Sequence, residues 1–399
     1  MNAFRSGLWR TLAAAALLAA ACTPAASPTA APARPSTPEP KVAPSGFVCP
    51  EPNPRADLTS PALNLFVWTE YIPQDILDCF SLVYGIEVNR EEFSSNEELY
   101  AKLRAGAASY DIVHPSDYII NVMIRDGLLQ ALDRTRLPNL KNIDPEYLKL
   151  YGDRDRYVVP YQVGSQAIVY DAERVPNPPR SWADLWKPEY AGRLVLVDDV
   201  RVVLGMTLLT LGYSVNATDP GQLAEAEARL KELIPHVKLF DSDSPKTALI
   251  AGDADLGIVW NGEAYLAQRE RPSIQYVFPA EGAITFEDGF GLPADAPHPD
   301  AAYAWMNYTL QADVAWLLIR DYPYTVPNRA ALEYARTSSM AVTDADGRAT
   351  TPAELYRWYS ESLITNTPAA TLLAGHRVED VGEALQLYDR VWTEVKGGP

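Results

Sequence analysis

The chain has 399 residues, of which 47% are hydrophobic, and it carries a formal net charge of −18. This length suffices for one large two-lobed domain or for two ordinary domains. The acidic surface repels nucleic acid and anionic lipid headgroups, and no basic patch with interleaved aromatic residues occurs. The composition therefore argues against nucleic-acid binding and is compatible with a cationic ligand.

The N-terminus has the pattern of an export signal. Arg5 and Arg10 precede an apolar stretch that ends at Ala21 and is shorter than the about 20 apolar residues of a membrane-spanning helix. The residues before Cys22 resemble a bacterial lipobox, although Ala19 stands where Leu is usual. We expect residues 1–21 to be a signal peptide and Cys22 to carry a lipid anchor. Simple secretion, with Cys22 incidental, is the alternative.

Residues 22–61 are rich in Pro, Ala, Ser and Thr, a composition that buries too little apolar surface to fold, so we expect a disordered tether. If Cys22 is lipidated, Cys49 and Cys79 remain in a compartment where disulfides persist, and we predict a bond between them. Two unpaired cysteines, with Cys79 buried, are the alternative. No residues have metal-ligand spacing, and we expect no metal and no cofactor.

The next segments alternate between strand and helix. A strand is predicted from Leu63 to Trp68, followed by a helix that Pro73 opens and Gly85 ends. Three further elements are predicted: a strand at Ile86–Phe93, a helix capped by Ser95 and Glu98, and a strand at Tyr110–Val113. This order favours a mainly parallel sheet.

The second half of the chain follows a loop-rich region at 133–157. The predicted strands are Val158–Tyr170, Leu194–Val197, Leu256–Val259, Tyr276–Pro279 and Gly289–Leu292. The predicted helices are Val202–Leu211 and Pro220–Ile234, and the chain is helix-rich from Pro299 except for a loop at Asp321–Asn328.

Several apolar strands end in clusters of aromatic, hydroxyl and carboxylate residues: Trp68–Tyr71, Ser116–Tyr118, Asp198–Asp199 and Trp260–Glu263. Because ligands of α/β sheets bind at the carboxyl ends of strands, we expect these clusters to converge on one site. Aromatic faces attract an ammonium group by about 0.5–2 kcal/mol per contact, and carboxylates accept charge-assisted hydrogen bonds from it. The clusters therefore suit a flexible protonated amine. Taken alone, each could be an ordinary turn.

Residues for catalysis are lacking. The histidines are His114, His236, His298 and His376, and we expect surface or packing roles for them. The sequence contains no Gly-x-Ser-x-Gly elbow, no phosphate-binding Gly-rich loop and no His-Glu-x-x-His run. We expect no catalytic residues and no enzymatic activity.

The residues Trp68–Tyr71, Tyr110–Tyr118, Ser181–Tyr190, Leu256–Gly262 and Pro327–Asn328 resemble the spermidine/putrescine-binding proteins of bacterial ABC importers. The resemblance extends from about Leu63 to Asn328. It implies the type II periplasmic-binding-protein fold, in which two α/β lobes, each a mainly parallel sheet flanked by helices, close on a ligand in the cleft between them. Residues 62–165 with 283–330 would form lobe 1, and residues 166–282 with 331–399 would form lobe 2.

The resemblance also implies a set of ligand-binding residues: Trp68, Thr69, Glu70, Tyr71, Ser116, Tyr118, Asp199, Trp260, Glu263, Phe286, Asp288 and Tyr324. Val202, Phe286 and Val378 depart from the family, where a carboxylate, a Trp and a Gln are usual. Glu263 matches an acid of putrescine-binding relatives and would compensate for Val202. These departures leave the choice between spermidine and putrescine open.

We therefore expect a monomeric, lipid-anchored protein outside the cytoplasm that captures spermidine or putrescine and delivers it to ABC transporter permease subunits. One alternative keeps the fold and changes the ligand to thiamine or ferric iron. Another makes the protein a polyamine sensor rather than a transport component.

Overall fold

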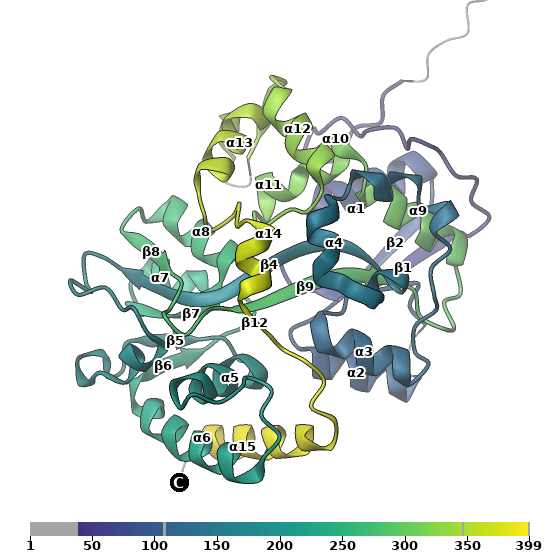
Figure 1. The fold of residues 1–399 in the computed structure, drawn as a ribbon. Helices are drawn as coiled ribbons and strands as arrows, with labels where there is room; N and C mark the ends of the chain where they lie inside the picture. Colours follow the sequence, from purple (N-terminus) through teal and green to yellow (C-terminus); the bar gives the residue numbers. More distant parts are fainter. Residues whose placement is uncertain (1–38, 107–108, 345–346, 398–399) are drawn as a thin grey trace, which may run out of the picture. The chain divides into compact units, whose positions relative to one another are not determined.

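The computed structural model describes residues 39–106, 109–344 and 347–397, and the body of the chain begins at Pro40 (Figure 1). The expected signal peptide and Cys22 lie outside these residues. The strands are β1 Ala62–Trp68, β2 Glu87–Phe93, β3 Ile112–Val113, β4 Val158–Asp171, β5 Leu194–Leu196, β6 Val237–Phe240, β7 Leu256–Trp260, β8 Ile274–Val277, β9 Ile284–Gly291, β10 Val342–Thr343, β11 Ala349–Thr350 and β12 His376–Arg377.

The α-helices are α1 Gln74–Tyr84, α2 Asn96–Ala105, α3 Asp117–Arg125, α4 Pro145–Tyr151, α5 Val200–Thr210, α6 Pro220–Leu233, α7 Lys246–Ala251, α8 Asn261–Glu270, α9 Pro299–Thr309, α10 Ala312–Ala315, α11 Leu317–Asp321, α12 Arg329–Thr337, α13 Pro352–Glu361, α14 Ala369–Ala374 and α15 Leu385–Gly397. Short 3-10 helices lie at Arg134–Arg136, Pro138–Asn142, Gly152–Arg156, Trp182–Trp186, Pro188–Tyr190, Ile234–His236 and Gly382–Ala384. No helix in the described residues is long and apolar enough to cross a membrane.

The main sheet has the order β2-β1-β3-β9-β4-β7-β5-β6, with β12 beside β9 and β8 beside β4. Strands β2, β1 and β3 are parallel to one another, as are β7, β5 and β6. Each parallel group is one lobe's share of the sheet. The carboxyl ends of its strands meet at one edge, and this is where ligands of such sheets bind.

Two long strands, β4 and β9, connect the groups and run side by side across the middle of Figure 1. β4 pairs antiparallel with β9 from Val158 to Gln166, and then with β7 from Gln166 to Tyr170. Every residue of β4 and β9 is buried. Gln166, where the two pairings meet, lies opposite Ile284 of β9 and Trp260 of β7.

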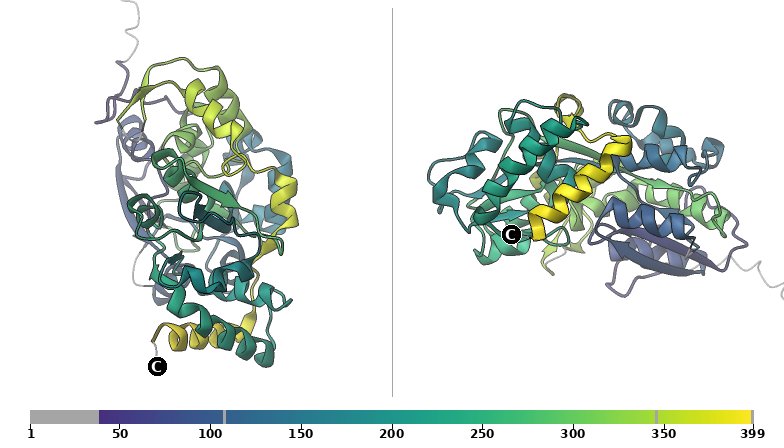
Figure 2. Two further views of the ribbon diagram at one scale, coloured as in Figure 1. Left: turned by 90° about the vertical axis from the view of Figure 1, so that its left-hand side faces the viewer. Right: turned by 90° about the horizontal axis from the view of Figure 1, so that it is seen from below.

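Helices cover both faces of the sheet. α1 and α9 share a hydrophobic cluster with Leu65 and Val67 of β1, whereas Phe66 belongs to a second cluster that includes α3, α5 and α6. α15 lies along α5 and α6, a contact that both views in Figure 2 show. Because successive β1 side chains point to two covered faces, the consecutive residues Leu65, Phe66 and Val67 are all apolar.

The segment expected to be a disordered tether is structured from Pro40 onward, so that part of the prediction is wrong. Ala43, Phe47 and Cys49 are buried in the cluster around α1 and α9. Cys49 is joined to Cys79 of α1, with 5.1 Å between their Cα atoms, which is the predicted pairing. A few apolar residues and one covalent bond hold a segment whose average composition is typical of disorder.

The assignment of residues 331–399 to lobe 2 is corrected in part. Ala331 and Ala335 of α12, and Leu355 and Tyr359 of α13, belong to the cluster that contains α1 and α9 of lobe 1. Only the later part of the segment, with Tyr388 of α15, packs on α5 and α6. The chain therefore crosses between the lobes again after α13.

Most element boundaries agree with the sequence to within a few residues. β9, however, begins at Ile284 rather than Gly289, and α4 lies in the region predicted to be loop-rich. No element was predicted where the structure has α3, α7, α8 and β6. Asp144 caps α4 by accepting a hydrogen bond from the Glu146 N–H at 2.9 Å. Ser95 likewise caps α2, as predicted.

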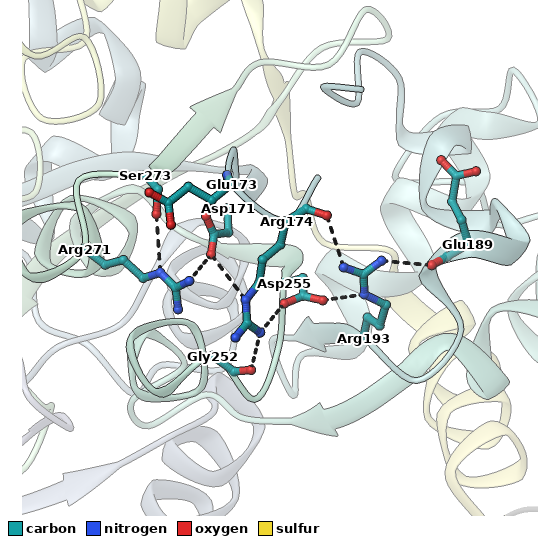
Figure 3. Close-up of polar contacts among 9 residues, drawn as sticks. All are labelled: Asp171, Glu173, Arg174, Glu189, Arg193, Gly252, Asp255, Arg271 and Ser273. Carbon is teal, nitrogen blue, oxygen red and sulfur yellow. Dashed lines mark hydrogen bonds and ion pairs between the residues drawn. The ribbon is translucent and has the colours of Figure 1, made fainter. Parts of the chain in front are cut away.

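A network of charged side chains fixes the end of the lobe 2 sheet that is remote from the β5 and β7 carboxyl ends (Figure 3). Asp255, just before β7, accepts hydrogen bonds from Arg193, just before β5, and from Arg174 at 2.7 Å. Asp171, at the end of β4, pairs with Arg271 at 2.5 Å. Because these pairs connect residues that flank three strands, they fix the strands relative to one another.

Candidate functional site

The cluster residues predicted from the sequence line one cavity of about 70 Å³. This volume is several times the about 10–15 Å³ that a single water molecule needs by the same measure. The wall contains every residue of the expected set: Trp68, Thr69, Glu70, Tyr71, Ser116, Tyr118, Asp199, Trp260, Glu263, Phe286, Asp288 and Tyr324. They come from the carboxyl ends of β1, β3, β5 and β7, from β9, and from the loop after α11.

The loop after β1 contributes the residues around Glu70. Glu70 has φ 48° and Asp117 has φ 34°, and they are the non-glycine residues with positive φ in the described chain. Such backbone costs about 1–3 kcal/mol per residue and occurs where a site fixes the side chains. Both strained residues line the cavity. Nearby, Trp68 Nε1 is buried and has no hydrogen-bond partner among the described residues, so it is a donor open to a ligand.

Asp288 is the buried carboxyl group on β9. Tyr71 donates a hydrogen bond to its Oδ2 at 2.7 Å, and Ser116 donates to its Oδ1. Burial raises the pKa of Asp288 to about 8, although these two hydrogen bonds act to lower it. No basic side chain in the described residues forms an ion pair with Asp288. The group is therefore a buried carboxyl without a cation.

Asp199 is a second carboxyl group of the wall; it is half-buried and caps α5. It accepts hydrogen bonds from the Arg201 N–H at 2.8 Å and the Val202 N–H at 3.1 Å. Burial raises the pKa of Asp199 to about 6, the nearby Glu97 adds to this increase, and the two N–H groups reduce it. The cap fixes the carboxylate at the cavity wall.

A third acidic region contains Glu263 in the first turn of α8. Both of its carboxylate oxygens accept hydrogen bonds from Lys246 Nζ, at 3.1 and 3.0 Å, and the same nitrogen donates to Glu70 at 2.6 Å. Burial raises the pKa of Glu263 to about 6 against the opposing effect of Lys246. Burial alone would lower the pKa of Lys246, but Glu263 and Glu70 together raise it.

The aromatic residues form one side of the cavity. The Tyr324 ring packs edge-on against Tyr71, with 5.0 Å between centroids, and against Phe286, with 6.1 Å. Gly262 lies so near Tyr324 that a Cβ atom there would come within 2.6 Å of the ring. Trp260 Nε1 donates to the Gln166 side-chain oxygen at 3.0 Å when that amide is oriented to satisfy its neighbours. These rings can pack against the methylene groups of a ligand.

The sequence missed further residues of the wall, namely Asn96, Gln166, Arg201, Ser242, Asp243 and Ile284, and it assigned Asp117 no binding role. Val202 and Val378, which depart from the family pattern, also line the cavity. Arg201 packs between the rings of Tyr118 and Tyr388, at 4.9 and 4.7 Å from their centroids. The strand-end clusters are predicted by local motifs. No local motif in the sequence indicates that Gln166 or Ser242 lines the cavity.

His114 is the histidine nearest to the site. Its ring is buried among Tyr71, Tyr161 and Phe290, with centroid separations of 5.2, 4.9 and 4.5 Å. Burial lowers the pKa of His114 to about 3, so the imidazole is neutral at physiological pH. It packs behind Tyr71 and supports that ring.

Comparison with known proteins identifies the family. Residues 78–345 match the bacterial extracellular solute-binding proteins. The chain belongs to this family. It is 36% identical over 339 residues to the spermidine/putrescine-binding periplasmic protein of Salmonella typhimurium, covering 84% of this chain and 92% of that protein. It is 32% identical over 290 residues to a putrescine-binding periplasmic protein of Escherichia coli, covering 67% and 78%.

A solved structure from the same family supports the fold. The substrate-binding protein of a spermidine/putrescine ABC transporter from Streptococcus pneumoniae superposes with a TM-score of 0.66 at 31% identity, covering 85% of this chain and 99% of that one. The resemblance to the spermidine/putrescine-binding family and the two-lobed α/β fold are thus confirmed. The solute-binding family is one of transport components.

Proposed function

We propose that this protein captures a polyamine outside the cytoplasm and delivers it to the permease of an ABC importer, without chemical change to the ligand. The observation that carries the proposal is the composition of the cavity wall. The buried Asp288 and the half-buried Asp199 face the same space as Trp260 and Tyr324. A buried carboxylate without a cation is costly, and a ligand ammonium relieves that cost. The names of the relatives agree with this ligand class.

In the proposed complex, each ligand ammonium pairs with a carboxylate, and the methylene chain lies between aromatic rings. Asp288 binds one terminal amine with Tyr71 and Ser116 beside it, and Asp199 binds another with Tyr118 nearby. Trp68 Nε1 and Ser242 Oγ lack partners among the described residues and are available to orient the ligand. The residues that we propose to surround the ligand are those of the expected set, together with Gln166.

A thermal-shift panel tests the proposal. Putrescine, cadaverine, spermidine and spermine are compared with thiamine and ferric citrate at equal concentrations. A ligand present at one hundred times its Kd stabilises the folded state by about 2.7 kcal/mol, which raises Tm by several degrees in a chain of this size. A shift with at least one polyamine is the expected result. No shift with any of them would overturn the proposal.

We further propose that the protein is anchored through a lipid on Cys22 and acts as a monomer. A Cys22→Ser variant should appear in the soluble fraction, whereas the wild type should remain with the membrane. A polyamine sensor would have the same cavity. Uptake of labelled polyamine by cells with and without the protein distinguishes the two roles, because loss of a sensor leaves uptake intact.

A further inference from the structure

Lys246 at the start of α7 forms an internal ion-paired bridge at one end of the cavity. Its Nζ lies 2.6 Å from Glu70, 3.0 Å from the nearer oxygen of Glu263 and 2.9 Å from Ser244 Oγ. An ammonium group has three hydrogens to donate, and these acceptors use all of them. The Lys246 side chain is 18% exposed and the Glu263 side chain 3% exposed. The bridge is therefore desolvated on the Glu263 side.

The bridge connects residues from both lobes and from both sides of the cavity wall. Glu70 follows β1 in lobe 1, whereas Lys246 and Glu263 belong to lobe 2. Glu70 and Glu263 line the cavity, and Glu70 and Lys246 line a larger groove of about 690 Å³ outside it. The Lys246 ammonium thus lies between the cavity and the groove, where it neutralises the carboxylates at that end.

The remaining carboxylates set the number of ligand amines. Asp288 is buried and Asp199 is half-buried, and neither forms an ion pair within the described residues. Asp243 also lines the wall, but it is exposed, and an exposed pair contributes little. Asp117 lines the wall as well, but three guanidinium groups, those of Arg154, Arg377 and Arg201, already compensate it: burial raises the pKa of Asp117 and their charges act to lower it. Asp288 and Asp199 remain as the acceptors for ligand ammonium groups.

We propose that Lys246 is a resident cation that occupies the amine subsite formed by Glu70 and Glu263 and thereby selects diamines over triamines. This inference rests on the proposed function and specifies the substrate class of the same site. A diamine satisfies both Asp288 and Asp199. The third ammonium of a triamine finds its acceptors already bound to Lys246, and it must displace that side chain or stay unpaired. An unpaired buried ammonium weakens binding.

Calorimetric titration of Lys246→Met with putrescine and spermidine tests the assignment. The variant keeps most of the side-chain volume and removes the charge, so Glu70 and Glu263 become free to accept a ligand ammonium. Because one charge-assisted hydrogen bond corresponds to roughly a tenfold or greater change in affinity, the spermidine-to-putrescine affinity ratio should rise at least about tenfold. Lys246→Gln serves where the Met variant does not fold, and circular dichroism checks folding.

Two further variants identify the cause. In Lys246→Met/Glu263→Gln the released subsite lacks its buried carboxylate and keeps only the exposed Glu70, so most of the gain for spermidine should disappear. Lys149→Met removes an exposed lysine paired with Glu146 and should leave the ratio unchanged. An unchanged ratio in Lys246→Met, or an equal gain in Lys149→Met, would overturn the inference while polyamine binding by the wild type still stands. Binding of neither polyamine by any variant would overturn the proposed function as well.

Discussion

The Tyr71 hydroxyl donates a 2.7 Å hydrogen bond to Asp288 Oδ2, although the two residues are 217 positions apart in the chain. This contact joins the loop after β1 to the connecting strand β9. Ser116 donates to the other carboxyl oxygen, so loops that follow two strands of lobe 1 converge on Asp288. The carboxyl group is thus oriented before any ligand arrives, and preorganisation of this kind lowers the entropic cost of binding.

Replacement of Asp288 by Asn should weaken polyamine binding by tenfold or more. The amide keeps the shape of the carboxyl group but cannot neutralise an ammonium, and a hydrogen bond to a charged group contributes about 1.5–3 kcal/mol. Calorimetric titration with putrescine and spermidine measures the loss. Asp253→Asn is the matched control, because Asp253 is exposed and precedes β7 at the end remote from Trp260. Equal affinities for wild type and Asp288→Asn would contradict the role assigned to Asp288.

Polyamine affinity should increase from pH 6 to about pH 8.5. Burial raises the pKa of Asp288 to about 8 in the empty cavity, so near neutral pH this carboxyl group is protonated. A ligand ammonium, whose own pKa is near that of Lys at about 10.4, favours the carboxylate and expels the proton. As the pH rises through 8, the proton is already gone and binding no longer has to remove it.

The proton released on binding can be counted. Titrations at pH 7 in two buffers of different ionisation enthalpy should give close to one proton released per ligand from Asp288, with a smaller contribution from Asp199, whose pKa of about 6 is already below the experimental pH. The Asp288→Asn variant should lose most of this release. An affinity that falls between pH 6 and 8.5 would be incompatible with a protonated Asp288 in the empty cavity.

The site was predictable where one strand end carries several of its residues. Trp68–Tyr71 and Trp260–Glu263 follow apolar strands, and parallel packing brings such ends to one edge of the sheet. The Lys246 bridge was not predictable, because its contact with Glu70 spans 176 positions and neither residue lies in a pattern that names the other. Long-range pairing of single side chains leaves no local signal.

The strands, like the site residues, were predicted where the local sequence determines them and missed where contacts with distant residues do. β4 was predicted almost to the residue, because apolar residues such as Val158, Val163 and Ile168 recur along it. The start of β9 was missed because Glu287 and Asp288 interrupt its apolar pattern, although both are buried. Glu287 is compensated by Arg154 and Arg377, which come from other parts of the chain. In a sequence, a charged residue indicates a surface position unless its buried ion-pair partners are known.

Loss of the Cys49–Cys79 disulfide should destabilise the protein without weakening polyamine binding. The bond spans 30 positions and joins the segment before β1 to α1. Restricting a loop of this length in the unfolded chain stabilises a protein by about 2–4 kcal/mol. Urea unfolding of Cys49→Ala/Cys79→Ala should show a loss of this size, and reduction of the wild type provides the same comparison without new cavities. Neither cysteine lines the ligand cavity, so a Kd changed more than a few-fold would be unexpected.

Gly262→Ala should abolish or strongly weaken polyamine binding while the fold is retained. A Cβ atom at Gly262 would lie 2.6 Å from two carbons of the Tyr324 ring, so the ring has to move, and with it the aromatic wall that includes Tyr71 and Phe286. The expected loss in a calorimetric titration is tenfold or more. Gly205→Ala in α5 is the control, because its Cβ would meet Ile284 and Val215 at 3.5 Å, an ordinary contact, and Ala favours the helix. A Gly262→Ala protein that binds as tightly as Gly205→Ala would show that the Tyr324 position does not govern binding.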